Sequence, residues 1–569
     1  QVALGASTPA QESSIPSLIR RVVSPPFFHG AVFCILVRIG VLSARSGYER
    51  YVPRGAAGAA TGGSESPFQP FSESLPGRAF FFLDGRGIVM EQWSSRAGFV
   101  LAAIGSAVGI GNIWRFPAVL GQNGGGAYLV PFLLAIFICA LPLMVLELAM
   151  GRHYRGTVIS SFAAVRQGFG TVGWFLFAVN LLVLSYYLVI AGWTLGYFLF
   201  ALTGTGVEFS FFTSGWLPVL TFAATTVVTG VVVTRGVREG IERVSTLTIP
   251  VSIGILVLLA LYGSTLPGFA EGIDFLLRPD FSVLGDPLIW SAAFGQAFFS
   301  LSVGTGILLT YGAYIDREQS LPLSSLVITV VDIGVALLAG VVIFPLVFSL
   351  ALVPAAGAEL AFTTLPAAFA LLPAGWLIGP AFYLVLFFAA LTSSVSMLEV
   401  GVSAVHESTG WSRVRSGSVL TGVLLLLGLP AALSYSAANL RLDGIRVLDL
   451  LDETVGTLGL PLTALLLAVI FTWFVSRETL AAEIGLRAAR VVYSACRYVI
   501  PAVLVITTGA RLLSGLDFPA LRILPETGFI GVLFQVEGVS IILLVLLVLI
   551  LAGRWLLGRF PGGGGRDPG

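Results

Sequence analysis

Apolar runs of about 18 or more residues recur along the chain, and they constrain its fold more than any other feature. Hydrocarbon offers backbone amides no hydrogen-bond partners, so each run must form a helix about as long as the bilayer is thick. Hydrophobic residues fill 56% and charged residues only 11% of the 569 positions, which excludes an ordinary soluble globule. The sequence therefore predicts an all-α polytopic membrane protein embedded in the lipid bilayer. A net charge of +1 argues against a nucleic-acid partner.

About twelve spans fit the apolar runs. They cover residues 97–119, 127–150, 174–202, 216–234, 244–263, 288–314, 321–352, 377–405, 416–435, 447–475, 498–514 and 529–557. Arginines concentrate in the loops after the second, fourth, eighth and tenth spans, whereas the opposite loops carry more of the acidic residues. By the positive-inside rule, this pattern predicts a multi-pass protein of the plasma membrane with both termini in the cytoplasm.

Residues 1–89 differ from the remainder, because they are rich in Ser, Pro, Gly and Arg and contain only one short apolar run, 31–42. Arg38 interrupts that run, which is too short and too charged to cross a bilayer securely. The first methionine of the chain is Met90. We expect the natural protein to start at or near Met90, and residues 1–89 to be disordered or a product of start-site assignment.

The first span is interrupted near its middle by the segment 105–117, which contains Gly105, Gly109 and Gly111. A helix broken at bilayer depth leaves amides and carbonyls without intrahelical partners, so the break must line an enclosed site that satisfies them. Its free carbonyls can coordinate a small cation, and the free amides that open the second half-helix can receive an anionic group. The alternative is a glycine-lined helix-packing face. Asn112 and Arg115, within the same segment, favour a site.

The sixth span repeats this feature, because Gly304 and Gly306 lie among hydroxyl-bearing residues in the apolar segment 295–306. Two interrupted helices, each heading a five-helix half, are typical of an inverted repeat with a substrate site at the midplane. We accordingly divide the chain into four parts. They are the extension 1–89, the first repeat with the sixth span at 90–320, the rest of the second repeat at 321–475, and two further spans with a cytoplasmic C-terminus at 476–569.

Several motifs then resemble one family of membrane transporters. They are Trp-Ser-Ser-Arg at 93–96, the segment 105–117, Asn-Gly-Gly-Gly-Ala at 123–127, Pro-Leu-Met-Val-Leu-Glu at 142–147, Gly-Arg at 151–152 and the segment 295–306. From about Met90 to its end, the chain is similar to the neurotransmitter:sodium symporters, above all to their prokaryotic amino-acid transporters. The resemblance implies a LeuT-type fold, which is a 5+5 inverted repeat with broken helices 1 and 6 followed by two C-terminal transmembrane helices.

The resemblance also implies two sodium sites. The positions that match the first are Ala107, Asn112, Ser300 and Asp332, together with the substrate carboxylate, and those that match the second are Gly105, Val108, Ala389, Thr392 and Ser393. Hard oxygen ligands of this kind suit a small monovalent cation. Without the family, the hydroxyls of the run 391–394 would more simply indicate a helix-packing face with hydrogen bonds to the preceding turn.

Asp332 is the most informative single residue, because it lies in the otherwise apolar stretch 327–344, where an ionised group is costly and usually functional. Members of the family often have asparagine here, and chloride-dependent members balance the sodium charges with a bound chloride. Ala336, one turn further on, replaces the glutamate of some chloride-independent members. We infer that Asp332 supplies the missing negative charge directly and makes transport independent of chloride. An aspartate that is merely hydrogen-bonded between helices is the alternative.

The same correspondence implies a substrate pocket. Its residues are Ala107, Gly109, Ile110, Gly111, Val183, Tyr187, Phe299, Ser300, Ser302, Thr305, Ser393 and Met397. Monoamine carriers have an aspartate where this chain has Gly109, which leaves room for a carboxylate on the substrate itself and favours an α-amino acid. Val183, Phe299 and Met397 suggest an apolar or aromatic substrate side chain. Thr305, where the leucine transporter has a bulky aromatic, leaves its size open.

Gate residues follow from the resemblance as well. Arg115 and Asp452 match the extracellular pair of the family. On the cytoplasmic side Glu407 matches the acidic residue of the family's inner gate, but the position of its usual arginine partner is occupied by Met90. We therefore expect the packing of Trp93 to contribute more to closing the inner gate. Each of the three charged residues could instead be an ordinary helix-end residue.

These inferences together predict a sodium-coupled symporter of L-amino acids, hydrophobic or aromatic, that works by alternating access without chloride. We expect a monomer or a weak homodimer. A carrier of another small zwitterion or osmolyte, and a non-transporting sensor on the same fold, are the alternatives within this architecture. An enzyme is disfavoured, because the spans contain no constellation of His with Glu or Cys that could supply a nucleophile and base or a metal site.

Overall fold

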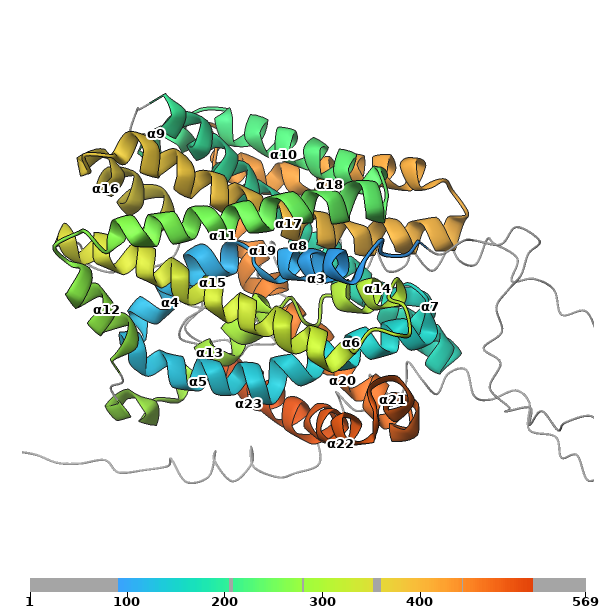
Figure 1. Ribbon diagram of the computed structural model, residues 1–569. Helices are drawn as coiled ribbons and strands as arrows, with labels where there is room; N and C mark the ends of the chain where they lie inside the picture. The colour runs from blue at the N-terminus through green and yellow to red at the C-terminus, as the bar shows by residue number, and fades with distance from the viewer. Residues whose placement is uncertain (1–90, 204–207, 279–280, 352–359, 443, 515–569) are drawn as a thin grey trace, which may run out of the picture. The chain divides into compact units, whose positions relative to one another are not determined.

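Helices make up nearly all of the structure. The computed structural model describes residues 91–203, 208–278, 281–351, 360–442 and 444–514, all within the second of two compact units, Ala79–Gly569 (Figure 1). The α-helices are α3 (Arg96–Ala107), α4 (Phe116–Gln122), α5 (Leu129–Ala135), α6 (Leu141–Tyr154), α7 (Val158–Val165), α8 (Gly170–Leu202), α9 (Phe209–Ser214), α10 (Leu217–Thr234), α11 (Arg243–Gly263), α12 (Phe269–Leu277), α13 (Pro287–Ser300), α14 (Ile307–Ala313), α15 (Leu321–Ser349), α16 (Leu365–Leu371), α17 (Gly375–Thr409), α18 (Arg413–Ser434), α19 (Val447–Leu451), α20 (Leu460–Trp473), α21 (Arg477–Ile484), α22 (Leu486–Ser494) and α23 (Ile500–Ser514).

Short 3₁₀ and π segments join or extend many of these helices. The π segments are η1 (Gly111–Arg115), η3 (Ile136–Ala140), η5 (Val237–Glu242), η7 (Leu360–Thr364), η8 (Asp452–Gly459) and η9 (Ala495–Val499), and the 3₁₀ segments are η2 (Gly125–Tyr128), η4 (Gln167–Phe169) and η6 (Phe281–Gly285). Two short strands, β1 (Arg441–Leu442) and β2 (Ile445–Arg446), form an antiparallel pair.

The membrane-crossing lengths agree with a polytopic protein. Over the described residues, nine helices are long and apolar enough to span a bilayer, and the bent pair of α3 with η1 and α4 adds a tenth. The two halves of that pair meet at an angle of 51°. The predicted interruption of the first span is therefore confirmed. The predicted span 529–557 and the extension 1–89 lie outside the described residues.

The sixth span is interrupted as well. Helix α13 ends at Ser300 and α14 begins at Ile307, and the residues between them follow no regular helix. Gly304 and Gly306 have φ values of 84° and 83°, a region that side-chain-bearing residues rarely adopt. A Cβ atom on Gly304 would lie only 2.6 Å from the Cβ of Ala464. Backbone conformation and close packing thus both require glycine at this break.

Some helix ends differ from the predicted boundaries. The span predicted from residue 498 begins earlier, because α22, η9 and α23 run on from Leu486. Arg487 and Arg490 lower the mean hydropathy of α22, but both are exposed, whereas Ala489 and Val492 are buried. A search for apolar runs does not detect an amphipathic helix of this kind, because its charged residues interrupt the run.

Two long helices form the centre of the bundle. Helices α8 and α17 pack against each other more extensively than any other pair, and α3, α11 and α18 pack around α17. Short helices cap the ends of the spans: α7 and α21 lie at one end in Figure 1, and α9, α12 and α16 lie at the opposite end. Both broken spans contact one of the two long helices, since α3 and α14 pack against α17.

Candidate functional site

The break in the first span exposes backbone amides, and side chains of other elements satisfy them. Helix α3 ends at Ala107, and the Val108 amide still donates to Ile104 O over 2.7 Å. The next amide, that of Gly109, donates to Asn112 Oδ1 over 3.2 Å. The Ile110 amide faces the hydroxyl of Tyr187 on α8 at 3.5 Å. The expectation that protein groups must line this break is met.

Carbonyls of the last turn of α3 contact both the sixth span and α17. The Ser106 carbonyl accepts hydrogen bonds from Ser302 Oγ at 2.8 Å and from Ser393 Oγ at 3.2 Å. Ser393 Oγ also lies 3.4 Å from the Gly105 carbonyl. Ser302 adopts a φ of 53° within the sixth-span break, so the strained backbone there aims its hydroxyl at α3.

The first predicted sodium positions come together as a buried cluster. Asn112 Nδ2 donates to Asp332 Oδ1 over 2.7 Å and lies 3.0 Å from Ser300 Oγ, which donates to Asp332 Oδ2 over 2.6 Å. The Asp332 side chain is fully buried, and Ala107 is also buried. We call Ala107, Asn112, Ser300 and Asp332 the first cation set. Its polar members come from η1, α13 and α15, so it links the two broken spans to an intact one.

A buried carboxylate needs compensating charge or hydrogen bonds. Asp332 accepts both of its side-chain hydrogen bonds from neutral groups, and among the described residues no arginine or histidine lies within ion-pair distance of it. Asn112 turns Nδ2 toward the carboxylate and Oδ1 toward Gly109, so its oxygen faces the cluster only after rotation of the amide. The arrangement fits a small cation as the missing counter-charge.

The second predicted positions lie where α3 crosses α17. We call Gly105, Val108, Ala389, Thr392 and Ser393 the second cation set, and all five are buried. A Cβ atom on Gly105 would lie 3.2 Å from Thr392 Cβ, so the two helices approach closely. Thr392 Oγ1 donates back to the carbonyls of Phe388 (3.0 Å) and Ala389 (3.2 Å) on its own helix. The second set therefore contains neutral oxygens only.

Two hydroxyl groups lie close to Gly109 in the predicted substrate pocket. Tyr187 and Ser393 share a hydrogen bond between their hydroxyls. A Cβ atom on Gly109 would lie 2.8 Å from Ser393 Oγ and 3.2 Å from Tyr187 Oη. Any side chain at position 109 would thus intrude on this pair of hydroxyls.

The other predicted pocket residues discussed below belong to α8, α13, α17 and the sixth-span break. The ring of Phe299 covers Gly111, where an added Cβ would lie 2.6 Å from Phe299 Cε1. Val183 and Met397 are buried apolar side chains on α8 and α17. Thr305 is also buried, but its hydroxyl donates to Ser302 O over 2.7 Å, within the break itself.

Two polar residues that the sequence analysis did not assign support the breaks. Glu147 of α6 is fully buried, and its Oε1 accepts the amide of Gly304 over 2.6 Å. Gln296 of α13 donates from Nε2 to the Gly111 carbonyl over 2.9 Å. Each is a polar residue within an apolar span, which is the sequence signal that could have identified it.

The predicted outer gate residues lie apart. The Arg115 guanidinium lies 4.8 Å from the centroid of the Phe299 ring, in a cation–π arrangement. Asp452 is hydrogen-bonded to Tyr186. No ion pair within 4.0 Å joins Arg115 to Asp452 in the described part of the chain. Their role as a pair stays a prediction.

At the opposite end, the structure supplies partners for Glu407 and Trp93. Glu407 accepts from Ser160 Oγ (2.9 Å) and from the Thr157 amide (3.3 Å), so it caps the start of α7. The indole of Trp93 is buried and donates to Tyr311 O over 3.3 Å. The contacts of Glu407 are those of a helix-end residue, which was the alternative to a gate.

A charged cluster near Trp93 was not predicted. Arg413 at the start of α18 pairs with Glu91 at 3.2 Å and with the buried Glu399 of α17. Tyr314 donates its hydroxyl to Glu399 Oε1 over 2.8 Å. Arg413 therefore ties the segment that precedes α3 to α17 and α18.

Comparison with known proteins identifies relatives of this architecture. The family described as "Sodium:neurotransmitter symporter family" matches residues 90–207 and 206–551. The uncharacterized sodium-dependent transporter YhdH of Bacillus subtilis is 38% identical over 405 residues, which cover 69% of this chain and 90% of YhdH. An uncharacterized sodium-dependent transporter of Methanocaldococcus jannaschii is 33% identical over 422 residues, covering 69% of this chain and 84% of the relative.

A solved structure agrees with the fold. The crystal structure of MhsT in complex with L-phenylalanine superposes with a TM-score of 0.69 at 36% sequence identity, and the match covers 74% of this chain and 99% of MhsT. The predicted all-α, LeuT-type fold with interrupted helices is thereby confirmed.

Proposed function

The chain belongs to the sodium:neurotransmitter symporter family, and from this premise we propose that it is a sodium-coupled symporter of an α-amino acid with an apolar or aromatic side chain. The observation that carries the proposal is the buried cluster of Asn112, Ser300 and Asp332 between the two broken spans. Two relatives are named sodium-dependent transporters, and MhsT was crystallised with L-phenylalanine. These names support the choice of sodium and of the substrate class.

Charge supports sodium as the ion at the first cation set. Asp332 is a buried carboxylate with neutral hydrogen-bond donors, so a monovalent cation restores electroneutrality locally. With an aspartate in this position, we propose that the site needs no chloride. We propose the second cation set as a further sodium site, because it offers the hard neutral oxygens that sodium accepts.

The amino-acid substrate is proposed to lie against the first-span break. Its carboxylate would accept from the Ile110 and Gly111 amides and from Tyr187, close to the first cation set. Gly109 keeps the hydroxyls of Tyr187 and Ser393 clear of any side chain, whereas an aspartate in that position would place a negative charge against them. The side chain would face Val183, Phe299 and Met397, which favours an apolar or aromatic group.

We propose that alternating access depends on ion pairs that close the outer or the inner side of the helix bundle. We propose that sodium in the first cation set draws η1, α13 and α15 together and so completes the amino-acid site. Arg115 and Asp452 would pair when the outer side closes, whereas Arg413 and its two glutamates would separate when the inner side opens. We further propose cytoplasmic termini, a plasma-membrane location and a monomer or weak homodimer.

Uptake of radiolabelled L-phenylalanine into proteoliposomes tests this function. An inward sodium gradient should drive accumulation, which should vanish when potassium replaces sodium, and other apolar L-amino acids should compete. Accumulation of L-phenylalanine that does not depend on the sodium gradient would overturn the proposal. Competition by betaine but not by apolar amino acids would favour an osmolyte carrier, and saturable binding without uptake would favour a sensor.

A further inference from the structure

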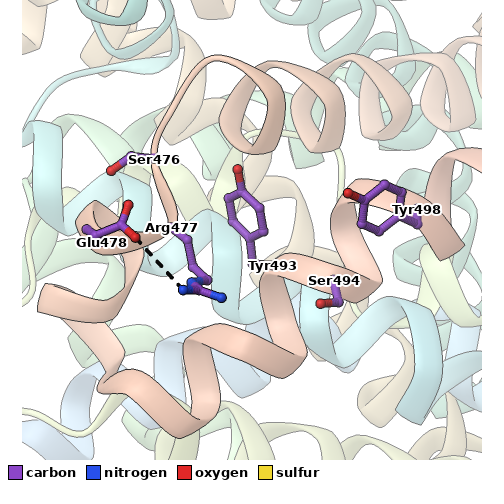
Figure 2. Close-up of a pocket in the computed structure, with 6 residues that line it drawn as sticks. All are labelled: Ser476, Arg477, Glu478, Tyr493, Ser494 and Tyr498. Carbon is purple, nitrogen blue, oxygen red and sulfur yellow. Dashed lines mark ion pairs between the residues drawn. The ribbon is translucent and has the colours of Figure 1, made fainter.

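A pocket of about 410 Å³ lies at the junction of α21, α22 and η9, far in sequence from the broken spans. It is lined by Ser476, Arg477, Glu478, Tyr493, Ser494 and Tyr498. Figure 2 shows Arg477 and Glu478 on one side, Ser494 and Tyr498 on the other, and Tyr493 between them. Its volume lies within the range of about 300–1,000 Å³ that is typical of small-ligand sites. The lining offers one guanidinium and four hydroxyls.

The walls of the pocket are held in place by hydrogen bonds. Arg497 donates to Tyr493 Oη over 2.6 Å and to Thr472 O over 2.7 Å, which joins η9 to the end of α20. Helix α21 is anchored to α6, because Arg152 Nε lies 2.7 Å from Glu483 Oε2. Burial raises the pKa of the Glu483 carboxyl, but hydrogen bonds from His153 and Arg152 outweigh it and lower the pKa overall, so this anchor stays charged.

The guanidinium of Arg477 is the cation that remains available in this pocket. Its only ion pair within the described chain is with Glu478, at 3.9 Å, and the two side chains are 52% and 76% exposed. Water and salt screen an exposed pair at this distance, so a stronger anion can displace it. The Glu478 carboxylate therefore competes with an anionic ligand for the Arg477 guanidinium.

The surroundings of the pocket are those of a membrane surface. One wall follows the end of a span at Trp473, and the other wall belongs to the N-terminal part of the next span, Leu486–Thr508. Trp473, Phe474 and Tyr498 are 56%, 53% and 64% exposed. An exposed Trp side chain at the end of a span, such as that of Trp473, is typical of the headgroup layer, where the ring is apolar and its polar edge is hydrated.

Local charge favours an anion. Residues 473–498 contain four arginines and two glutamates, and Glu483 is already paired with Arg152. The excess of arginines also assigns this end of the bundle to the cytoplasmic leaflet, which is the leaflet rich in anionic lipids.

We propose that this pocket binds the phosphate headgroup of an anionic phospholipid of the cytoplasmic leaflet. Arg477 pairs with the phosphate, the hydroxyls of Ser494 and Tyr498 donate to its oxygens or to the glycerol, and the exposed aromatic rings contact the upper acyl chains. This binding is separate from the substrate site and does not depend on the proposed transport function.

Native mass spectrometry of the full chain, released from vesicles of phosphatidylglycerol and phosphatidylcholine in equal amounts, tests the proposal. We expect selective retention of phosphatidylglycerol. Arg477→Gln should lower that retention about fivefold, since one arginine at a membrane surface contributes about 1 kcal/mol. Glu478→Gln should raise it, because the competing carboxylate is lost. Ser494→Ala, a smaller change in the lining, should lower retention modestly while leaving the fold intact.

Arg243→Gln provides the matched control, because Arg243 is likewise exposed and, among the described residues, its one ion pair is with its helix neighbour Glu239 at 3.4 Å. It should retain phosphatidylglycerol as the unmodified chain does. Equal retention of the two lipids, or unchanged retention in both Arg477→Gln and Ser494→Ala, would overturn the proposal. Displacement of the bound lipid by excess inorganic phosphate would show that the pocket takes free phosphate, and would overturn the assignment to a lipid.

Discussion

The two cation sets lie on either side of the same helix break but are built in different ways. The first set surrounds the buried carboxylate of Asp332, and Asn112 and Ser300 donate to it over 2.6–2.7 Å from two other elements. The second set has no carboxylate. Its Thr392 hydroxyl already bonds to the carbonyls of its own helix. The first set thus contains a carboxylate without a cationic partner, whereas the Thr392 hydroxyl of the second set is neutral and already hydrogen-bonded.

This difference indicates how strongly each set depends on a cation. A buried carboxylate without a cationic partner is costly, so binding of sodium at the first set gains Coulomb energy in a region of low dielectric constant. At the second set a cation must compete with existing hydrogen bonds, each contributing about 0.5–1.5 kcal/mol. We therefore expect the first set to dominate sodium affinity, and the second to respond more weakly to substitution.

Replacement of Asp332 by asparagine should have the largest effect. Removing one partner of a buried charge pair costs about 3–5 kcal/mol, which corresponds to a loss of sodium affinity of roughly a hundredfold or more. The sodium concentration that supports half-maximal L-phenylalanine uptake in proteoliposomes measures this loss.

Asp274→Asn is the matched control for this substitution. Asp274 is an exposed carboxylate on α12 whose one ion pair in the described part of the chain is with Arg278, at 3.3 Å. Its replacement should leave the sodium dependence unchanged. If Asp332→Asn behaved like Asp274→Asn, Asp332 would be a structural aspartate hydrogen-bonded between helices.

Asn112→Ala should have the next largest effect. It removes a donor that lies 2.7 Å from the Asp332 carboxylate and also a candidate sodium ligand. Hydrogen bonds to charged groups contribute about 1.5–3 kcal/mol, so sodium affinity should fall roughly tenfold or more. Asn123→Ala serves as control, because the Asn123 side chain donates locally to Val119 O at the end of α4, away from the Asp332 carboxylate in sequence. Full sodium affinity in Asn112→Ala would contradict the assignment of the first set.

Much of this architecture could be predicted from local features of the sequence. Glycines at positions 304 and 306 in an apolar run predicted a break, and the structure has positive φ at both. Asp332 was identified because a carboxylate within an apolar span is costly unless it has a function. Glu147 and Gln296 carry the same signal, but their contacts with Gly304 and Gly111 join segments distant in sequence, and only packing brings those together.

The conformational state of the gates and the long-range partners of the charged residues were harder to predict from the sequence. Arg115 and Asp452 correspond to a family pair, yet Arg115 lies over Phe299 in this structure. A pair that forms in one state and separates in another has no signature in a single sequence. Arg413 was assigned only to a loop, because its partners Glu91 and Glu399 lie on other segments.

Thr392→Val should have a smaller effect than either substitution in the first set. Valine keeps the shape of threonine but removes the hydroxyl, whose neutral interactions contribute about 1 kcal/mol, or roughly fivefold in sodium affinity. Thr229→Val is the matched control, since Thr229 is equally buried in a span and donates back to Thr225 O over 2.8 Å. If Thr392→Val lowered sodium affinity as much as Asp332→Asn does, the two sets would contribute equally, and the first set would not dominate sodium binding.

Replacement of chloride by gluconate should have the smallest effect of all. If the Asp332 carboxylate balances the sodium charge within the first set, no mobile anion is required, and sodium-driven uptake should change by less than about twofold, which is below 0.5 kcal/mol. Replacement of sodium by potassium in the same vesicles provides the positive control and should abolish accumulation. A marked loss of uptake without chloride would show that the negative charge comes from solution, and Asp332 would then have to be protonated or already neutralised when sodium binds.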